Sequence, residues 1–229
     1  MKKKREIFGK AIIEYFKDNS SRLFLIKKDK TKFIIDLSYY FREYEDLSIL
    51  EKKAISLTKG RILDVGCATG YYIPALRKYG IVDAIDISEN AIKVAKAKEI
   101  IECHVADIYK YNPYKKYDTI TLLENNIGLG GTLLKTKRLF KILTKLLKSN
   151  GQIIAIMRHT NYKNKFYSSK YTPLWKGKLL KKIRWFYFNI NYLPRFCHKY
   201  NLKLEILGED NDEGRKMYLI RLTHNNSLK

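Results

Sequence analysis

The segment around residues 61–70 most constrains what this chain can fold into. Residues 62–65 form an apolar run that contains Asp64, and Gly66, Ala68 and Gly70 then alternate with other residues. The run predicts a buried strand, and the residues after Gly70 can begin a helix. A strand that turns into a helix through small residues lets a ligand lie against bare backbone. A dinucleotide-binding turn has much the same pattern, so the rest of the chain must distinguish the cofactors.

Strands and helices are expected to alternate after this turn. Further strands are predicted at residues 81–86, 100–105, 117–123 and 152–157, and helices at residues 70–79, 88–97 and 133–147. A helix near residues 192–200 precedes two closing strands, 203–207 and 216–222, joined by a polar turn. The alternation predicts an α/β fold with a Rossmann-like, doubly wound parallel sheet, and the closing strands predict an antiparallel hairpin at one edge.

Two regions lie outside this alternation. Residues 1–58 carry helical spacing at 6–16 and 39–57, with a short strand or a linker expected at 33–37 between them. This predicts an N-terminal helical cap before a cofactor-binding domain at residues 59–229. Residues 158–191 are basic, aromatic and weakly periodic. They are interpreted as an insertion over the ligand face.

The charge of the chain is large and unevenly distributed. The formal net charge is +23, and residues 125–204 contain eighteen Lys plus Arg and no Asp or Glu. Such a half can attract nucleic acid, an anionic membrane surface or an acidic substrate. Drift in a composition rich in Lys, Ile, Asn and Tyr explains it equally well.

Other compositional features indicate a cytoplasmic protein. No apolar run approaches the roughly 20 residues that span a bilayer, and the basic N-terminus lacks the apolar stretch of a signal peptide. Cys67, Cys103 and Cys197 are scattered, which predicts free thiols in a reducing compartment and no metal site.

Ligands of open α/β sheets bind beyond the carboxyl ends of the strands, so the residues there are the site candidates. Asp86 lies twenty positions after Gly66, where a carboxylate would meet a ribose diol. Its alternative role is a solvated strand end or helix cap. Asp107 could accept a hydrogen bond from an adenine amino group, or could simply bond its own backbone as loop aspartates do.

The strand at residues 117–123 is followed by Glu124, Asn125 and Asn126 and then by glycines. This cluster places amides where they could hold the reactive end of a cofactor or a substrate. A dinucleotide fingerprint would place its third, helix-packing glycine at Tyr71, which is far too large.

Together these segments resemble the class I S-adenosylmethionine (SAM) dependent methyltransferases of prokaryotic type, many without an assigned substrate. Residues 64–70 resemble their motif I, with Ala68 in place of the usual Gly, and residues 84–88, 106–108 and 117–126 extend the resemblance. It implies a seven-stranded sheet with an antiparallel last strand and S-adenosyl-L-methionine as cofactor. The residues that it implies for binding are Asp64, Gly66, Ala68, Gly70, Asp86, Ile87, Asp107, Ile108 and Asn125.

Methyl transfer from a sulfonium is an in-line displacement, so positioning and desolvation supply much of the acceleration. A general base is needed only where the acceptor carries a proton at neutral pH. His159, directly after a strand, is the base candidate, although an exposed loop histidine would look the same. Glu124 and Asn126 are the other catalytic candidates, as groups that orient the acceptor.

The sequence does not decide which class of molecule accepts the methyl group. A small molecule or a protein fits the lid-like insertion. RNA is the alternative, because cations and aromatics interleave over residues 158–203 as phosphate contacts and base stacking require, and a polyanion could bind residues 125–204. Neither an Asn/Asp-Pro-Pro-aromatic motif nor a Pro-Cys nucleophile is present. A nucleic-acid-binding module with an unused SAM pocket is the third interpretation.

Overall fold

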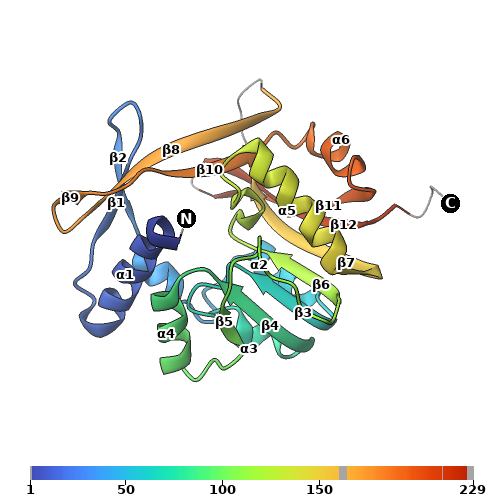
Figure 1. Ribbon diagram of the computed structural model, residues 1–229, viewed down its shortest axis with the longest axis horizontal. Coiled ribbons are helices and arrows are strands. Elements are labelled where there is room, and N and C mark those ends of the chain that lie inside the picture. Colours follow the sequence, from blue (N-terminus) through green and yellow to red (C-terminus); the bar gives the residue numbers. More distant parts are fainter. Residues whose placement is uncertain (1, 160–163, 213, 226–229) are drawn as a thin grey trace.

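A computed structural model of the chain describes residues 2–159, 164–212 and 214–225, and it contains two β-sheets (Figure 1). The larger sheet has the strand order β11-β12-β7-β6-β3-β4-β5. Its strands are β3 (Gly60–Val65), β4 (Gly80–Asp86), β5 (Cys103–Val105), β6 (Tyr117–Leu122), β7 (Leu147–Arg158), β11 (Leu202–Asp212) and β12 (Arg215–His224). All its pairs are parallel except those that β12 makes with β7 and β11. The predicted seven-stranded sheet with an antiparallel last strand is confirmed.

Helices cover both faces of this sheet, which explains why its central strands are apolar runs. Along β3, Leu63 and Val65 face one core cluster and Ile62 faces the other. The first cluster is closed by α5 (Leu133–Leu146) and α6 (Leu193–His198), and the second by α2 (Ile49–Ser56), α3 (Ile73–Leu76) and α4 (Glu89–Ala97). The doubly wound arrangement is therefore confirmed.

Two helices differ from their predicted extent. The helix expected at residues 70–79 forms only over α3, because Gly70 to Tyr72 make the turn and Gly80 already begins β4. The helix expected at residues 39–57 is split into the 3₁₀ turn η1 (Leu37–Phe41) and α2. Here α2 starts afresh at Ser48, whose hydroxyl accepts from the backbone N–H of Glu51 in a capping box.

The smaller sheet joins the two regions that lay outside the predicted alternation. It contains β1 (Leu23–Ile26), β2 (Lys32–Ile35), β8 (Phe166–Trp175), β9 (Lys178–Leu179) and β10 (Ile183–Phe188), and we call it the accessory sheet. All its pairs are antiparallel, and β1 lies between β2 and β8. Residues 1–58 are thus not purely helical: β1 and β2 form an antiparallel pair, and β1 also pairs with β8 of the insertion at residues 158–191. The short strand expected at residues 33–37 lies partly within β2.

Helix α1 (Lys2–Asp18) fills the space between the accessory sheet and α4 (Figure 1). Ala11 and Ile12 are buried in a third cluster with Leu23 of β1 and Val94 of α4. The Glu6 carboxylate accepts hydrogen bonds from backbone N–H groups at the start of α4, where the helix dipole favours a negative charge. Within the described residues no helix is both long and apolar enough to cross a membrane.

Candidate active site

The turn after β3 has the conformation that its small residues predict. Gly66 has φ +85°, and a Cβ there would lie 2.6 Å from the Asn126 side-chain nitrogen. That amide donates to the carbonyls of Val65 (2.9 Å) and Gly66 (3.2 Å), so Asn126 fixes the turn from the end of the neighbouring strand β6. Ala68 also has positive φ, +50°. A glycine adopts this conformation without strain, which explains why the methyltransferase family that the sequence resembles usually has Gly at the position of Ala68.

Three buried polar side-chain atoms at this edge of the sheet have no hydrogen-bond partner among the described residues. They are Asp64 Oδ2, Asn125 Nδ2 and Arg158 Nε, from the carboxyl ends of the adjacent strands β3, β6 and β7. Buried polar atoms are usually paired, and the exceptions gather where a ligand completes them. The set contains one acceptor and two donors, so it suits a ligand that carries both a positive and a negative group.

Asp64 is held in this position by the sheet itself. Its other oxygen, Oδ1, accepts from the Thr121 hydroxyl at 2.6 Å. Burial raises the pKa of Asp64 to about 6, and the nearby carboxylate of Asp86 adds to the rise. A donor or cation brought to Oδ2 would stabilise the ionised form.

Asp86 lies at the end of β4 beside the glycine turn. Its carboxylate accepts from the backbone N–H groups of Ser88 at 2.8 Å and Ala68 at 3.1 Å, which orients it toward the turn. Ile87 is partly buried next to it. The structure therefore places Asp86 on the same edge as Gly66, as the predicted ribose site requires.

The remaining cofactor candidates follow β5, the next strand along the edge. The Asp107 carboxylate accepts from the Tyr109 backbone N–H at 3.0 Å, the local bond that its alternative interpretation predicted. Ile108 is buried in the core between the sheet and α5. The backbone N–H of Ala106 donates to the Asp86 carbonyl at 2.8 Å, so the two strand ends are tied together.

Glu124 follows β6 in a left-handed conformation, φ +52°, that it shares with Asn125 at φ +59°. Consecutive left-handed residues are strained and are found most often at functional sites. The Glu124 carboxylate accepts from the Tyr39 hydroxyl at 3.2 Å and lies 3.9 Å from the Arg42 guanidinium. Burial, followed by the charge of Glu51, raises the pKa of Glu124 to about 7.

An ion pair between Arg42 and Glu51, which the sequence did not predict, lies beside Glu124. Arg42 donates to both carboxylate oxygens of Glu51, at 2.7 and 3.1 Å, while its guanidinium lies 3.3 Å from the Tyr39 ring centroid. Glu51 is 2% exposed and also accepts from the Tyr72 hydroxyl. The Ser48–Glu51 capping-box spacing was the available signal, although it announces only a helix start.

His159 follows β7, as predicted, but its ring is engaged in the structure. Its Nδ1 accepts from the Ile190 backbone N–H at 3.2 Å, and its ring meets that of Tyr218 edge-on. A neutral imidazole that accepts at Nδ1 carries its proton on Nε2 and has no lone pair left for a substrate proton. Burial and the charge of Lys216 lower the pKa of His159.

The glycines after Asn126 serve packing against the accessory sheet. A Cβ at Gly128 would lie 2.0 Å from the Phe186 carbonyl oxygen of β10, and one at Gly131 2.7 Å from that of Arg184. Ser168 of β8 donates to the Gly131 carbonyl at 2.7 Å. Strand β10 lies on this glycine loop, and only glycine leaves room for it.

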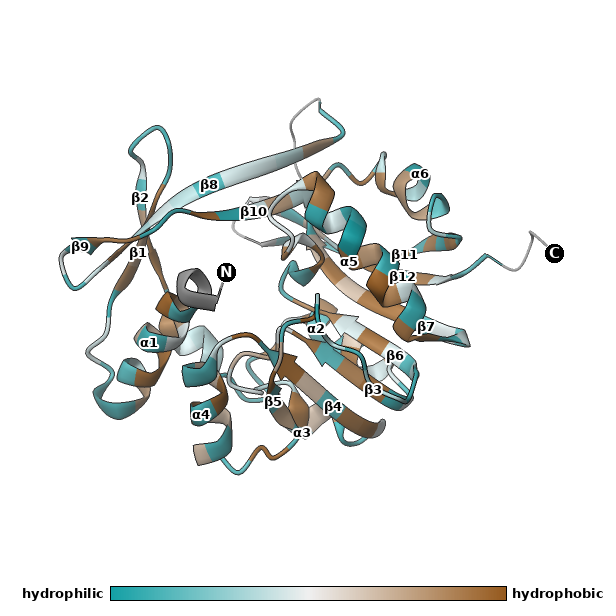
Figure 2. Cartoon of the chain, viewed as in Figure 1, coloured by the Kyte–Doolittle hydropathy of each residue, from teal (hydrophilic) through white to brown (hydrophobic). Residues whose placement is uncertain are grey.

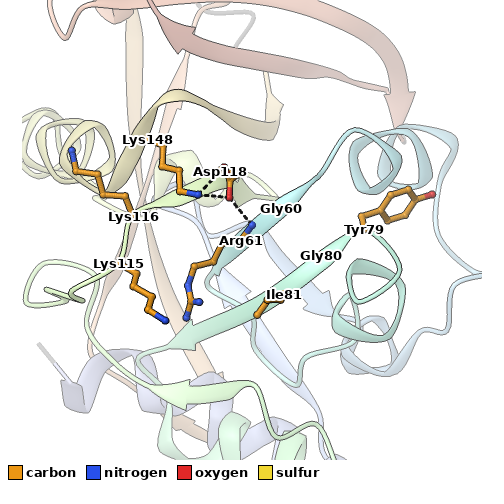
Figure 3. A pocket seen from close by; sticks show the side chains of 9 residues that line it. All are labelled: Gly60, Arg61, Tyr79, Gly80, Ile81, Lys115, Lys116, Asp118 and Lys148. Atoms are coloured by element: carbon orange, nitrogen blue, oxygen red, sulfur yellow. Dashed lines mark hydrogen bonds and ion pairs between the residues drawn. The ribbon is translucent and has the colours of Figure 1, made fainter.

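A cavity of about 630 Å³ lies at the opposite, amino edge of the same sheet (Figure 3). It is lined by Arg61, Lys115, Lys116 and Lys148 around Asp118. Asp118 accepts from Lys148 Nζ at 2.8 Å and from the Arg61 backbone N–H at 2.8 Å. None of the predicted site residues lines this cavity.

Comparison with known proteins agrees with this geometry. Residues 62–151 match the family described as "Methyltransferase domain". A malonyl-[acyl-carrier protein] O-methyltransferase of Ilyobacter polytropus is 38% identical over 106 residues, which are 41% of this chain and 37% of that protein. The chain spans less than half the length of the curated relatives that it matches.

Among solved structures, a SAM-dependent methyltransferase from Bacteroides fragilis in complex with S-adenosyl-L-homocysteine aligns with a TM-score of 0.81 and 23% identity, over 95% of this chain and 94% of that one. A sugar N-methyltransferase from Streptoalloteichus aligns with a TM-score of 0.59 and 12% identity, over 83% and 93% of the chains. The domain match, the sheet order and the glycine turn together support a class I SAM-dependent methyltransferase.

Proposed function

We propose that the chain transfers a methyl group from SAM to a small molecule bound between the carboxyl edge of the large sheet and the accessory sheet. The observation that carries this proposal is the set of three unpartnered buried atoms: Asp64 Oδ2, Asn125 Nδ2 and Arg158 Nε. An ammonium beside the first and a carboxylate beside the others would satisfy them, and SAM carries both groups on its amino-acid end. The bound cofactor supplies an activated methyl group on a sulfonium.

The residues of the chain bind the cofactor and orient it. Gly66 and Ala68 give the cofactor an open stretch of backbone, and Asp86 is assigned to the ribose hydroxyls. Asp107 and Ile108 are assigned to the adenine on the basis of the family resemblance. Asn126 acts as a positioning residue, because its amide is spent on the carbonyls of the glycine turn.

Glu124 is the proposed general base. It stands at the carboxyl end of β6, one residue from Asn125, and its pKa of about 7 matches the demands of proton transfer near neutral pH. The alternative base, His159, has its accepting nitrogen bonded to the backbone of Ile190. An amine or hydroxyl acceptor would give up its proton to Glu124 as the methyl group arrives.

The packing of the accessory sheet supports a small acceptor over RNA. Three aromatics of residues 158–203 make internal contacts: Phe186 is 1% exposed, Trp185 contacts Phe8 of α1, and the Trp175 indole donates to Ser21. Base stacking needs open ring faces. The sugar N-methyltransferase among the structural neighbours is named for a small acceptor, which agrees with this proposal.

Titration calorimetry with SAM and S-adenosylhomocysteine tests the cofactor assignment. We expect both to bind, and Asp86→Ala to weaken the affinity about 10- to 100-fold, the value of a hydrogen bond to a charged group. Asp118→Ala, at the opposite edge, is the matched control and should leave it unchanged. Absence of binding, or equal binding by the Asp86→Ala variant, would overturn the assignment.

A screen for S-adenosylhomocysteine release tests the acceptor. Amines and hydroxyl compounds of metabolite size are compared with RNA across salt concentrations. Turnover with a metabolite is the expected result. Turnover confined to RNA, with the steep salt dependence of phosphate contacts, would establish the alternative instead.

A further inference from the structure

The accessory sheet is covered on one face only. In its antiparallel pairs, Cα partners share a face, so the register sorts its side chains. Leu23 and Leu25 lie on the face that α1 covers, and both are buried. The opposite face, here called the outer face, carries Phe24, Ile26, Ile34, Leu174 and Leu179 by the same register.

The outer face is apolar, with Ile34 and Leu179 open to solvent and Phe24, Ile26 and Leu174 half-buried. Ile34 is 53% exposed and Leu179 is 67% exposed, and the buried clusters of the core include none of the five side chains. Figure 2 shows brown segments where β1, β2 and β9 cross, in the part of the accessory sheet that projects from the large sheet. Contiguous exposed apolar side chains of this kind mark an interaction surface.

Cations surround this face. Lys28 and Lys30 are exposed in the loop between β1 and β2, and Lys32 covers the Phe24 ring, with its Nζ 4.0 Å from the ring centroid. The strands β1, β2, β8 and β9 contain no Asp or Glu. The loop holds one acid, Asp29, which accepts from the backbone N–H of Thr31.

We propose that the outer face binds the surface of an anionic lipid bilayer. Aliphatic side chains that enter the acyl boundary and lysines that meet the headgroups are the two terms of interfacial membrane binding. A second copy of the chain fits less well, because two lysine-rimmed faces of a protein with a net charge of +23 repel each other. RNA fits less well too, because the single aromatic on this face is covered by Lys32.

Vesicle sedimentation with the full chain tests the proposal. Vesicles of phosphatidylcholine alone are compared with vesicles that contain phosphatidylglycerol, at two salt concentrations. We expect binding to the anionic vesicles only, weakened by salt. Ile34→Asp should reduce the partition coefficient about tenfold through loss of a buried aliphatic side chain. Lys28→Glu with Lys30→Glu should reduce it about 25-fold or more, at about fivefold per lysine.

The amino-edge cavity supplies matched controls. Ile81 is also 67% exposed, and Lys115 and Lys116 are exposed lysines beside it. Ile81→Asp, and Lys115→Glu with Lys116→Glu, should leave the partition coefficient within about twofold, because these side chains lie away from the outer face. SAM affinity, measured for every variant, shows that each is folded.

Three results would overturn the proposal. The first is no binding to anionic vesicles. The second is an equal loss of binding in the control variants, which would mean that net charge alone drives it. The third is a lipid-free dimer in sedimentation velocity that Ile34→Asp dissociates, or RNA binding that this variant abolishes, since the face would then belong to that partner.

Discussion

The pKa values of carboxyl groups shift in opposite directions at the two edges of the seven-stranded sheet. At the carboxyl edge, burial raises the pKa of Asp64 to about 6 and that of Glu124 to about 7. At the amino edge, hydrogen bonds from Lys148 and the Arg61 backbone lower the pKa of Asp118. The chain thus carries carboxylates on both edges, but only one edge holds them in an environment that disfavours their charge.

This difference in pKa indicates which edge of the sheet contains the active site. A paired, partly solvated carboxylate such as Asp118 stabilises the fold, because its charge is already satisfied. A buried carboxylate with an unpartnered oxygen, such as Asp64 Oδ2, costs stability until a ligand arrives. The amino edge has a cavity of about 630 Å³, but among the described residues no carboxylate of raised pKa lines it, so the electrostatics rather than the cavity identify the active edge.

Glu124→Gln offers the largest effect. Removing the base at an edge whose acids are poised for proton transfer should lower kcat about 10²- to 10⁴-fold, with SAM affinity nearly unchanged. The wild-type rate should rise with pH through about 7, as the carboxylate loses its proton. Steady-state release of S-adenosylhomocysteine with the acceptor from the screen measures both. A larger loss in His159→Gln than in Glu124→Gln would assign the base to His159.

Asp64→Asn should stabilise the apo protein while it weakens cofactor binding. The folded pKa of about 6 lies above the ordinary 3.8, so the folded state binds more protons and stability falls as pH rises from about 4 to about 6. Above pH 6 that loss is complete, and the asparagine variant avoids it. Urea unfolding at pH 8 should show a gain of about 2–3 kcal/mol that is absent at pH 4. A lower free energy of unfolding for the variant at pH 8 would contradict the inference that the buried charge of Asp64 destabilises the apo protein.

Asn126→Ala removes both hydrogen bonds to the carbonyls of the glycine turn. Each contributes about 1 kcal/mol, so we expect the free energy of unfolding to fall by about 2 kcal/mol and SAM affinity to fall about tenfold through a looser turn. Asn126→Asp keeps the size but replaces the donor, and should resemble the alanine variant. Urea unfolding measures the free energy of unfolding of both variants, and titration calorimetry at one temperature measures their SAM affinity. An effect on kcat alone would return Asn126 to the catalytic group.

Asp118→Asn should have the smallest effect. The carboxylate is 32% exposed and its pair with Lys148 is partly solvated, so its loss should cost about 0.5–1 kcal/mol at pH 7. Because its folded pKa is lowered, this contribution is present above the ordinary pKa and is lost as pH falls through the folded pKa. Urea unfolding at pH 7 and at low pH measures it. Any change in SAM affinity would break the contrast between the edges.

Local patterns account for the elements that the sequence predicted well. The large sheet, α4, α5 and the antiparallel closing hairpin follow from apolar periodicity, and the glycine turn follows from small residues at fixed spacing. The ends of elements were less predictable. The helix expected over residues 70–79 shortened to α3, because a turn and a strand start compete for its ends.

The sequence by itself determined the α/β class, the position of the cofactor turn and the place of Asp86 beside it, because these depend on residues close together in the chain. Only the tertiary structure decided what pairs across long distances. Ser21, just before β1, and Trp175 of β8 are 154 positions apart, yet the Trp175 indole donates to the Ser21 hydroxyl. Neither region by itself predicts the accessory sheet. The same holds at the site: Nδ1 of His159 is bonded to the Ile190 backbone N–H, and burial and the charge of Glu51 raise the pKa of Glu124. Desolvation and long-range contacts have no local signature, so only the folded chain reveals which carboxyl group is poised to act.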